Sequence, residues 1–181
     1  MVLLLIGAAV LAYTGIFSGP EPLAATAFNR PQISRINTDG RVLQPAISPD
    51  GKYLAYVSGE FGNRSLVVRQ LATDSIITLV PPTNLNLQSV SFGPGGDHVF
   101  YTLAGSDSSV STLYQVPTLG GVSKRVVEDV DGGAAFSPDG KSLAVAEQIG
   151  EWPKRSTRLA ILTLDEVLDA RRMAEQARKA A

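Results

Sequence analysis

The 181-residue chain contains no cysteine, one histidine and one tryptophan, and its 16 basic and 17 acidic residues leave a formal charge of −1. The absence of cysteine excludes disulfides, thiolate metal sites and thiol catalysis. A charge this close to zero provides no general attraction for a phosphate backbone, so we expect no nucleic-acid partner. Hydrophobic residues make up 44% of the chain and charged residues 18%, which is typical of a globular protein with a buried core.

Patterns that carry catalytic chemistry are scarce. His98 is the only histidine, so a Ser-His-Asp triad would have to use it, and no Gly-x-Ser-x-Gly nucleophile turn occurs in the sequence. Metal-ligand spacings, phosphate-binding glycine loops and kinase motifs are absent as well. We therefore expect no enzymatic activity, no cofactor and no metal site.

Residues 1–17, MVLLLIGAAVLAYTGIF, carry no charge, and the first charged side chain is Glu21. Three interpretations are open: an uncleaved membrane anchor, a signal peptide cut near Ala25-Thr26-Ala27, or a buried core helix. We expect residues 1–18 to form an apolar helix that acts as an anchor or signal segment, and residues 19–31 to form a linker. Either role would place everything after Asn29 outside the cytoplasm.

One phrase recurs along the chain. AISPDGKYLAYV (46–57) returns as AFSPDGKSLAVA (135–146), with a weaker copy, SFGPGGDHVFYT, at 91–102. The prolines of the three copies, Pro49, Pro94 and Pro138, are spaced by 45 and 44 residues. A period of this length is typical of propeller blades and solenoid repeats.

Each phrase places a tight turn between two apolar strands. Proline suits the second turn position, aspartate bonds to neighbouring backbone amides, and glycine accepts a positive φ at the end of the turn. The predicted turn residues are Ser48, Pro49, Asp50, Gly51, Pro94, Gly96, Ser137, Pro138, Asp139 and Gly140. Asp50 and Asp139 could also be interpreted as acid–base or calcium carboxylates, but the turn alone explains their recurrence.

Two further β-branched runs follow each hairpin in the first two units, SLVVRQL with SIITLV and STLYQVP with VSKRVV, and RLAILTL follows in the third. The pattern predicts an all-β partial propeller of about three four-stranded antiparallel blades over residues 32–164. A β-sandwich is the alternative. We also expect residues 31–40 to form an outer strand ahead of the first unit.

Three blades are fewer than a closed propeller usually has. The chain could be a fragment of a longer protein, two copies could form a homodimer that closes a six-bladed ring, or the three blades could form an open stack. After the last strand, residues 165–181 predict a helix, because Thr163 and Glu166 have capping-box spacing. This helix would pack on the third blade or bind a partner.

The repeated turn resembles that of the TolB-like β-propeller family, whose WD40-like repeats carry Ser-Pro-Asp-Gly-Lys before an apolar strand. The matching residues are 48–52 with Leu54-Ala55-Tyr56, and 137–141 with Leu143-Ala144-Val145. An apolar span ahead of such repeats is similar to bacterial membrane-anchored regulators with a cytoplasmic kinase or winged-helix domain. The family also includes periplasmic TolB and the substrate-gating propellers of prolyl-oligopeptidase-type peptidases.

The resemblance implies a non-enzymatic binding or sensing module, tethered to a bacterial inner membrane through residues 1–17, that takes a protein or small-molecule ligand. The alternative is a regulatory propeller from a receptor-type serine/threonine kinase or a peptidase. Binding could reside in the loops 58–65, 103–112 and 147–157. Trp152, within the last loop, is a candidate anchor for a partner or a cap on the third blade.

Overall fold

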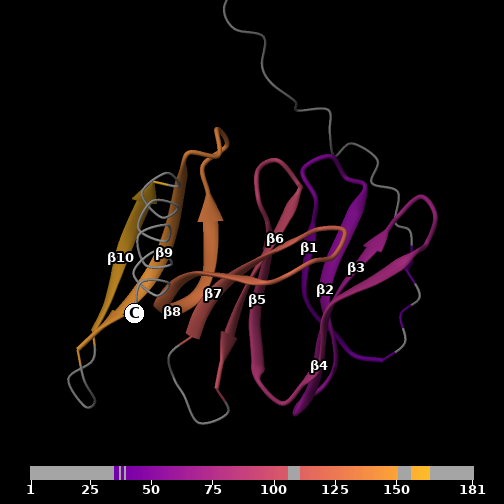
Figure 1. Ribbon diagram of the computed structural model, residues 1–181, viewed down its shortest axis with the longest axis horizontal. Helices are drawn as coiled ribbons and strands as arrows, with labels where there is room; N and C mark the ends of the chain where they lie inside the picture. Colours follow the sequence, from indigo (N-terminus) through magenta and orange to yellow (C-terminus); the bar gives the residue numbers. More distant parts are fainter. Residues whose placement is uncertain (1–34, 37, 39, 106–110, 151–155, 164–181) are drawn as a thin grey trace, which may run out of the picture. The chain divides into compact units, whose positions relative to one another are not determined.

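The computed structural model describes residues 35–36, 38, 40–105, 111–150 and 156–163 (Figure 1). The chain divides into two units, residues 1–37 and 38–181, and the architecture below is that of the second. Residues 1–34, Trp152 and the predicted helix at 165–181 lie outside the described residues. Among the residues that are described, no helix is long and apolar enough to cross a membrane.

The described part of the second unit is all-β. Strands β1 to β4 form one antiparallel sheet in sequence order, and β5 to β10 form a six-stranded antiparallel sheet, also in sequence order. The strands are β1 (Val42–Ile47), β2 (Tyr53–Glu60), β3 (Asn63–Gln70), β4 (Ile76–Thr83), β5 (Asn86–Phe92), β6 (His98–Ala104), β7 (Ser111–Pro117), β8 (Lys124–Phe136), β9 (Ser142–Ile149) and β10 (Ser156–Thr163).

The strands group into three blades that match the three copies of the turn phrase. Blade 1 is β1 to β4, blade 2 is β5 to β7 with the first half of β8, and blade 3 is the second half of β8 with β9 and β10. Strand β8 serves two blades because Val130 pairs with Ser111 of β7 and with Glu147 of β9. Positive φ angles of 58° at Asp129 and 86° at Gly132 bend the strand at this point.

One strand prediction is wrong in detail. The last strand of the second unit and the first strand of the third, predicted as separate, are the single strand β8, because the bend around Val130 turns the chain without breaking its pairing. The outer strand predicted at 31–40 falls mostly outside the described residues, and its described residues, 35–36, 38 and 40, are not in a strand. Four strands per blade hold for blades 1 and 2, whereas the described part of blade 3 has three.

The first strand of every blade is irregular at the same place. The register shifts between Leu43 and Ala46 in β1, between Leu87 and Ser89 in β5, and between Asp131 and Ala134 in β8. A bulge of this kind adds local twist to a strand. The three blades therefore repeat a backbone feature that their sequences do not share as a motif.

The hydrophobic core lies between blades. One cluster joins blade 1 to blade 2 and includes Leu66 and Phe92. A second cluster joins blade 2 to blade 3, where the rings of Phe100 and Phe136 lie 4.5 Å apart between centroids. Blade 2 therefore buries both of its faces, while blades 1 and 3 each bury one face against it.

One leucine marks the face that each blade turns toward the next blade. In each blade, the residue at one fixed distance after the turn proline pairs with a leucine of the neighbouring strand. The pairs are Val57 with Leu66, Thr102 with Leu113 and Ala146 with Leu159. Leu66 is 0% exposed and Leu113 is 1% exposed, because blades 2 and 3 cover them. Leu159 is 73% exposed.

We expect Leu66→Ala and Leu113→Ala each to lower the free energy of unfolding by about 2–5 kcal/mol, since each leaves a cavity between blades. Phe61→Ala is the control, because that side chain is 78% exposed and its truncation should cost less than about 0.5 kcal/mol. Urea unfolding followed by circular dichroism measures the three values. Equal losses at Leu113 and Phe61 would contradict the packing between blades.

Candidate functional site

The hairpin turns between the first two strands of each blade share one backbone geometry. In blade 1 the Ser48 amide donates to the Tyr53 carbonyl at 2.9 Å, and the Gly51 amide donates to the Ser48 carbonyl at 2.8 Å. Equivalent pairs of bonds, at 2.9–3.0 Å, close the turns of blades 2 and 3. The last turn residue has a φ of 70° or 72° in all three copies, a conformation that favours glycine. These residues are Gly51, Gly96 and Gly140.

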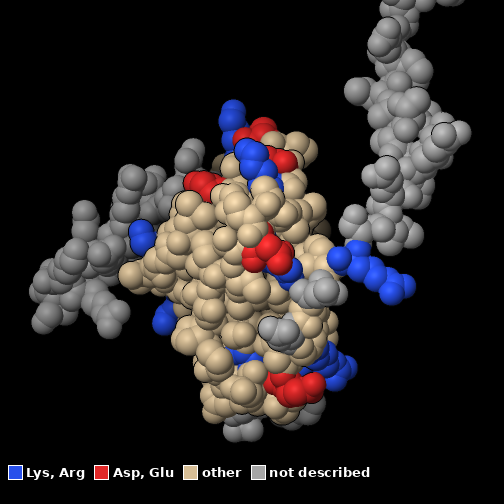
Figure 2. All heavy atoms as spheres, turned by 90° about the vertical axis from the view of Figure 1, so that its right-hand side faces the viewer, with Lys and Arg blue, Asp and Glu red and all other residues tan. Residues whose placement is uncertain are grey.

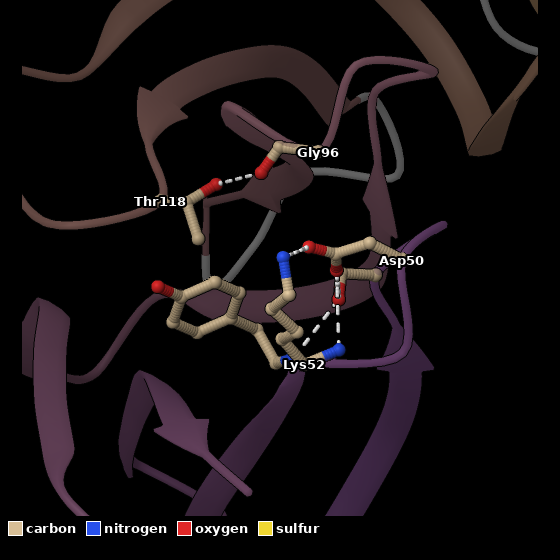
Figure 3. A network of polar contacts seen from close by, with 6 residues as sticks. Asp50, Lys52, Gly96 and Thr118 are labelled. Carbon is tan, nitrogen blue, oxygen red and sulfur yellow. Dashed lines mark hydrogen bonds and ion pairs between the residues drawn. The ribbon is translucent and has the colours of Figure 1, made fainter. Parts of the chain in front are cut away.

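The aspartate of the first turn is held inside the turn. Asp50 Oδ1 accepts hydrogen bonds from Ser48 Oγ at 2.7 Å and from the Lys52 amide at 3.1 Å, and Oδ2 lies 3.0 Å from Lys52 Nζ (Figure 3). The Ser48 hydroxyl, then the Lys52 amide and ammonium, lower the pKa of Asp50 to about 2. The carboxylate is therefore ionised at neutral pH and committed to the turn.

The third turn repeats this network. Asp139 Oδ1 accepts from Ser137 Oγ at 2.5 Å and from the Lys141 amide at 3.0 Å, and these bonds lower the pKa of Asp139. Turn 2 has Gly93 and Gly95 where the others have serine and aspartate, so it lacks this network. There Thr118 Oγ1 donates to the Gly96 carbonyl at 2.7 Å, which ties the turn to the end of β7 (Figure 3).

Neighbouring turns touch one another through proline and glycine. A Cβ atom at Gly96 would lie 3.5 Å from Pro49 Cδ, and one at Gly140 would lie 3.4 Å from Pro94 Cβ. The proline of each turn thus rests on the turn glycine of the following blade. At Gly51, in the first blade, a Cβ would meet no described atom within 4 Å.

The turn prolines share one hollow, which we call the proline groove. It has a volume of about 340 Å³, within the range of small-ligand sites. Its described lining consists of Pro49, Ser91, Phe92, Pro94, Ala134, Phe136, Ser137 and Pro138. The side chains that line it are apolar apart from two serine hydroxyls and none of them is ionisable, so it suits an uncharged group better than a charged one.

His98 lies beside a separate cavity of about 390 Å³ between the turns of blades 2 and 3. Its Nδ1 is 2.9 Å from Asp97 Oδ2, and Asp139 lines the same cavity. Asp139 is already bonded within its turn. Among the described residues, no group of three or more histidine and carboxylate side chains is placed to hold a metal ion.

The predicted binding loops join β2 to β3, β6 to β7 and β9 to β10, whereas the turns described above precede β2, β6 and β9. The first, 58–65, is not a loop: β2 continues to Glu60 and β3 begins at Asn63, which leaves a two-residue turn of Phe61 and Gly62. A Cβ at Gly59 would lie 2.3 Å from the Asn63 carbonyl oxygen, so glycine permits this close approach. The centres of the other two loops, 106–110 and 151–155, are outside the described residues.

Sequence reasoning assigned the turn prolines a structural role and did not predict that they meet in one groove. It also missed Phe92 and Phe136, which precede Pro94 and Pro138 at the same position of the repeat. The available signal was this shared position, because residues that are equivalent in a repeat come to lie side by side when the repeats stack.

No family model matches the chain. It is 27% identical over 130 residues to the protein TolB homolog of Chlorobium chlorochromatii (strain CaD3), covering 70% of this chain and 28% of the relative. The structure resembles TolB from Acinetobacter baumannii (TM-score 0.52, 20% identity, 67% of this chain and 29% of that one). It also resembles Pyrococcus horikoshii acylaminoacyl peptidase (TM-score 0.54, 11% identity, 70% and 24%). The chain spans less than a third of each of these proteins.

We expect Gly140→Val to destabilise the fold by more than Gly95→Val. Gly140 completes the full Ser-Pro-Asp-Gly turn at a φ of 72°, where a side chain costs about 1–2 kcal/mol. A Cβ at Gly95 would meet only the exposed side chain of Asp97 at 3.0 Å, which can move away. Gly96→Val should behave like Gly140→Val, because it shares the positive φ. The check is the free energy of unfolding in urea, and equal losses for Gly140→Val and Gly95→Val would refute the turn analysis.

Proposed function

Taking this chain as a segment of a TolB-like β-propeller, we propose that it is a non-enzymatic binding module and that its proline groove receives an apolar side chain of a protein partner. The observation that carries the proposal is the convergence of three turn prolines, one from each blade, on a single hollow. A groove of this volume accommodates a small molecule as well as one or two side chains of a larger ligand, and the proposal takes the protein partner that the resemblance to TolB-like propellers implies.

The chemistry of the groove supports this choice. Proline and phenylalanine rings offer rigid apolar surface that loses little conformational entropy when a ligand binds. Ser137 Oγ accepts a bond from the Ser142 amide at 2.9 Å and donates to Asp139, so this hydroxyl is already satisfied. Recognition would therefore depend on shape and apolar contact, and the Ser91 hydroxyl would be the polar group that contacts the ligand.

We also propose an extracytoplasmic location with a tether through residues 1–17. This run of 17 uncharged residues is close to the shortest length that spans a bilayer. The resemblance to TolB-like propellers supports a place outside the cytoplasm.

A peptide display experiment tests the groove. The full chain in mild detergent is presented to a library of random 12-residue peptides, and enriched peptides are synthesised and titrated. We expect them to share an apolar anchor residue, and we expect Ser91→Trp, which fills the groove, to weaken binding at least about tenfold, or 1.4 kcal/mol. Ala72→Trp is the matched control, since Ala72 is exposed in the turn after β3. Equal binding to wild type and Ser91→Trp would contradict the proposal.

Membrane fractionation tests the tether. We expect the full chain, produced in a bacterial host, to remain with the membrane after alkaline carbonate washing, and we expect a chain that begins at residue 19 to be released. External protease should digest the blades in spheroplasts if they face outward. Release of the full chain by carbonate would contradict the anchor, and protection from protease would contradict the location.

The rival proposal is a regulatory propeller of a larger enzyme. The observation that favours it is the likeness in fold to acylaminoacyl peptidase, together with the small share of that protein that the chain spans. In that arrangement the groove would face a domain of the same polypeptide. Peptide display would then give no ligand that Ser91→Trp weakens, so the same experiment separates the two functions.

A further inference from the structure

A second hollow lies between blades 1 and 2, and its described lining shares no residue with the proline groove. It has a volume of about 330 Å³. The lining comes from three segments: Tyr53 at the start of β2, residues 95–97 of turn 2, and residues 117–119 at the end of β7 and just after it. We call this hollow the Asp97 pocket.

The pocket is held in shape by hydrogen bonds that do not involve a ligand. Thr118, which is buried, donates from Oγ1 to the Gly96 carbonyl at 2.7 Å and from its amide to the Asp97 carbonyl at 2.9 Å. These bonds tie turn 2 to the end of β7. Because Gly95 and Gly96 carry no side chains, the space above the turn stays open. The pocket is therefore formed before a ligand enters it, which lowers the entropic cost of binding.

Turn 2 departs from the repeat at the two positions that carry charge in the other turns. In blades 1 and 3 an aspartate within the turn is followed two residues later by a lysine, as with Asp50 and Lys52. Turn 2 has Gly95 and Asp97 at these positions. The Asp50 carboxylate is bound inside its turn, 3.0 Å from Lys52 Nζ (Figure 3), whereas the Asp97 carboxylate follows its turn and lines the pocket.

One oxygen of the Asp97 carboxylate is available to a ligand. Oδ2 lies 2.9 Å from His98 Nδ1, and among the described residues no hydrogen-bond donor is paired with Oδ1. The Asp97 side chain is 73% exposed, so a ligand can reach it from solvent. Within the described lining no other side chain is an acid or a base of the Asp, Glu, Lys, Arg or His type, so the pocket favours a positively charged ligand.

The remaining walls select an organic cation with an apolar stem. The side chains of Tyr53, Pro117 and Leu119 offer aromatic and aliphatic surface beside the carboxylate. Arginine and lysine carry a charged group on an apolar stem, and aromatic rings attract such cations. A calcium or magnesium ion would leave these surfaces unused and would find one carboxylate where it prefers several oxygen ligands.

The charges elsewhere on the chain do not override this local preference. The formal charge of the whole chain is −1. On the side of the molecule that Figure 2 shows, acidic and basic side chains lie in small mixed groups with uncharged areas between them. Exposed charges more than about 10 Å apart are largely screened at 0.1 M salt. The Asp97 carboxylate therefore sets the charge that a ligand meets in the pocket.

We propose that the Asp97 pocket binds a basic side chain, an arginine or a lysine, of a partner protein. The stem of this side chain lies against Tyr53, Pro117 and Leu119, and its charged group donates to Asp97 Oδ1. The proposal does not rest on the proline groove, because the two sites share no described lining residue and each is tested by its own ligand.

A nuclear magnetic resonance titration tests the pocket. The full chain, labelled with ¹⁵N-glycine and ¹⁵N-threonine, is titrated in mild detergent at pH 8 with N-acetyl-arginine methylamide. We expect the amide signals of Gly95, Gly96 and Thr118 to shift and to saturate, since these residues line the pocket. The matched ligand is N-acetyl-citrulline methylamide, which replaces the guanidinium by an uncharged urea and should bind at least about threefold more weakly. Absence of these shifts, or equal binding of the two ligands, would overturn the proposal.

A pair of aspartate variants tests the carboxylate. We expect Asp97→Asn to weaken binding of the arginine compound at least about threefold, because the amide keeps the shape of the side chain and loses its charge. Asp131→Asn is the matched control, since Asp131 is exposed on β8 and does not line the pocket. Unchanged binding to Asp97→Asn would overturn the proposal.

A second pair of variants tests the wall of the pocket without altering Asp97. Leu119→Lys should also weaken binding at least about threefold, because its ammonium would compete for the carboxylate. Val122→Lys is the control: Leu119 and Val122 are 66% and 77% exposed in the loop between β7 and β8, and only Leu119 belongs to the described lining. Equal binding to the two lysine variants would overturn the proposal. Methylguanidinium carries the charge without the stem, so an affinity equal to that of the arginine compound would overturn the role of the apolar walls.

Discussion

The contact between successive blades is the interaction on which the rest of the structure depends. Each blade is too thin to bury its own apolar residues, so Leu66 and Leu113 become buried only when the next blade packs on them. At the turn end, the proline of one blade lies against the turn glycine of the next blade. A side chain at Gly96 or Gly140 would strain the backbone, while its Cβ would meet the neighbouring proline at an ordinary van der Waals distance.

The proline groove is a consequence of the same contact. Three equivalent turns, stacked at nearly constant spacing, bring residues 45 and 44 positions apart in sequence into one lining. The ionised aspartates of turns 1 and 3 are occupied by serine hydroxyls and backbone amides. Neither aspartate belongs to the described lining of the groove, which contains no ionisable side chain.

The local features of the fold could be predicted from sequence because they depend on short-range chemistry. Proline, aspartate and glycine at fixed positions predict the turns, and β-branched runs predict strands such as β3 and β7. Two features could not be predicted, because each depends on packing that a linear pattern does not contain. The continuity of β8 through Val130 depends on its pairing with two partners, and the groove depends on blades lying side by side. The expected loop at 58–65 failed because Gly59 and Gly62, both at positive φ, permit a much tighter turn.

The most direct test of the packing between blades is a nuclear Overhauser measurement on the full chain in detergent micelles, with the phenylalanine rings selectively labelled. Phe100 and Phe136 lie on blades 2 and 3, and the bend of β8 brings their ring centroids to 4.5 Å. We predict a strong cross-peak between their ring protons that is lost when either residue is replaced by leucine. A chain that shows the strand pairing of β6 to β9 but no such cross-peak would contradict the propeller arrangement, because the sheet would then continue without folding into blades.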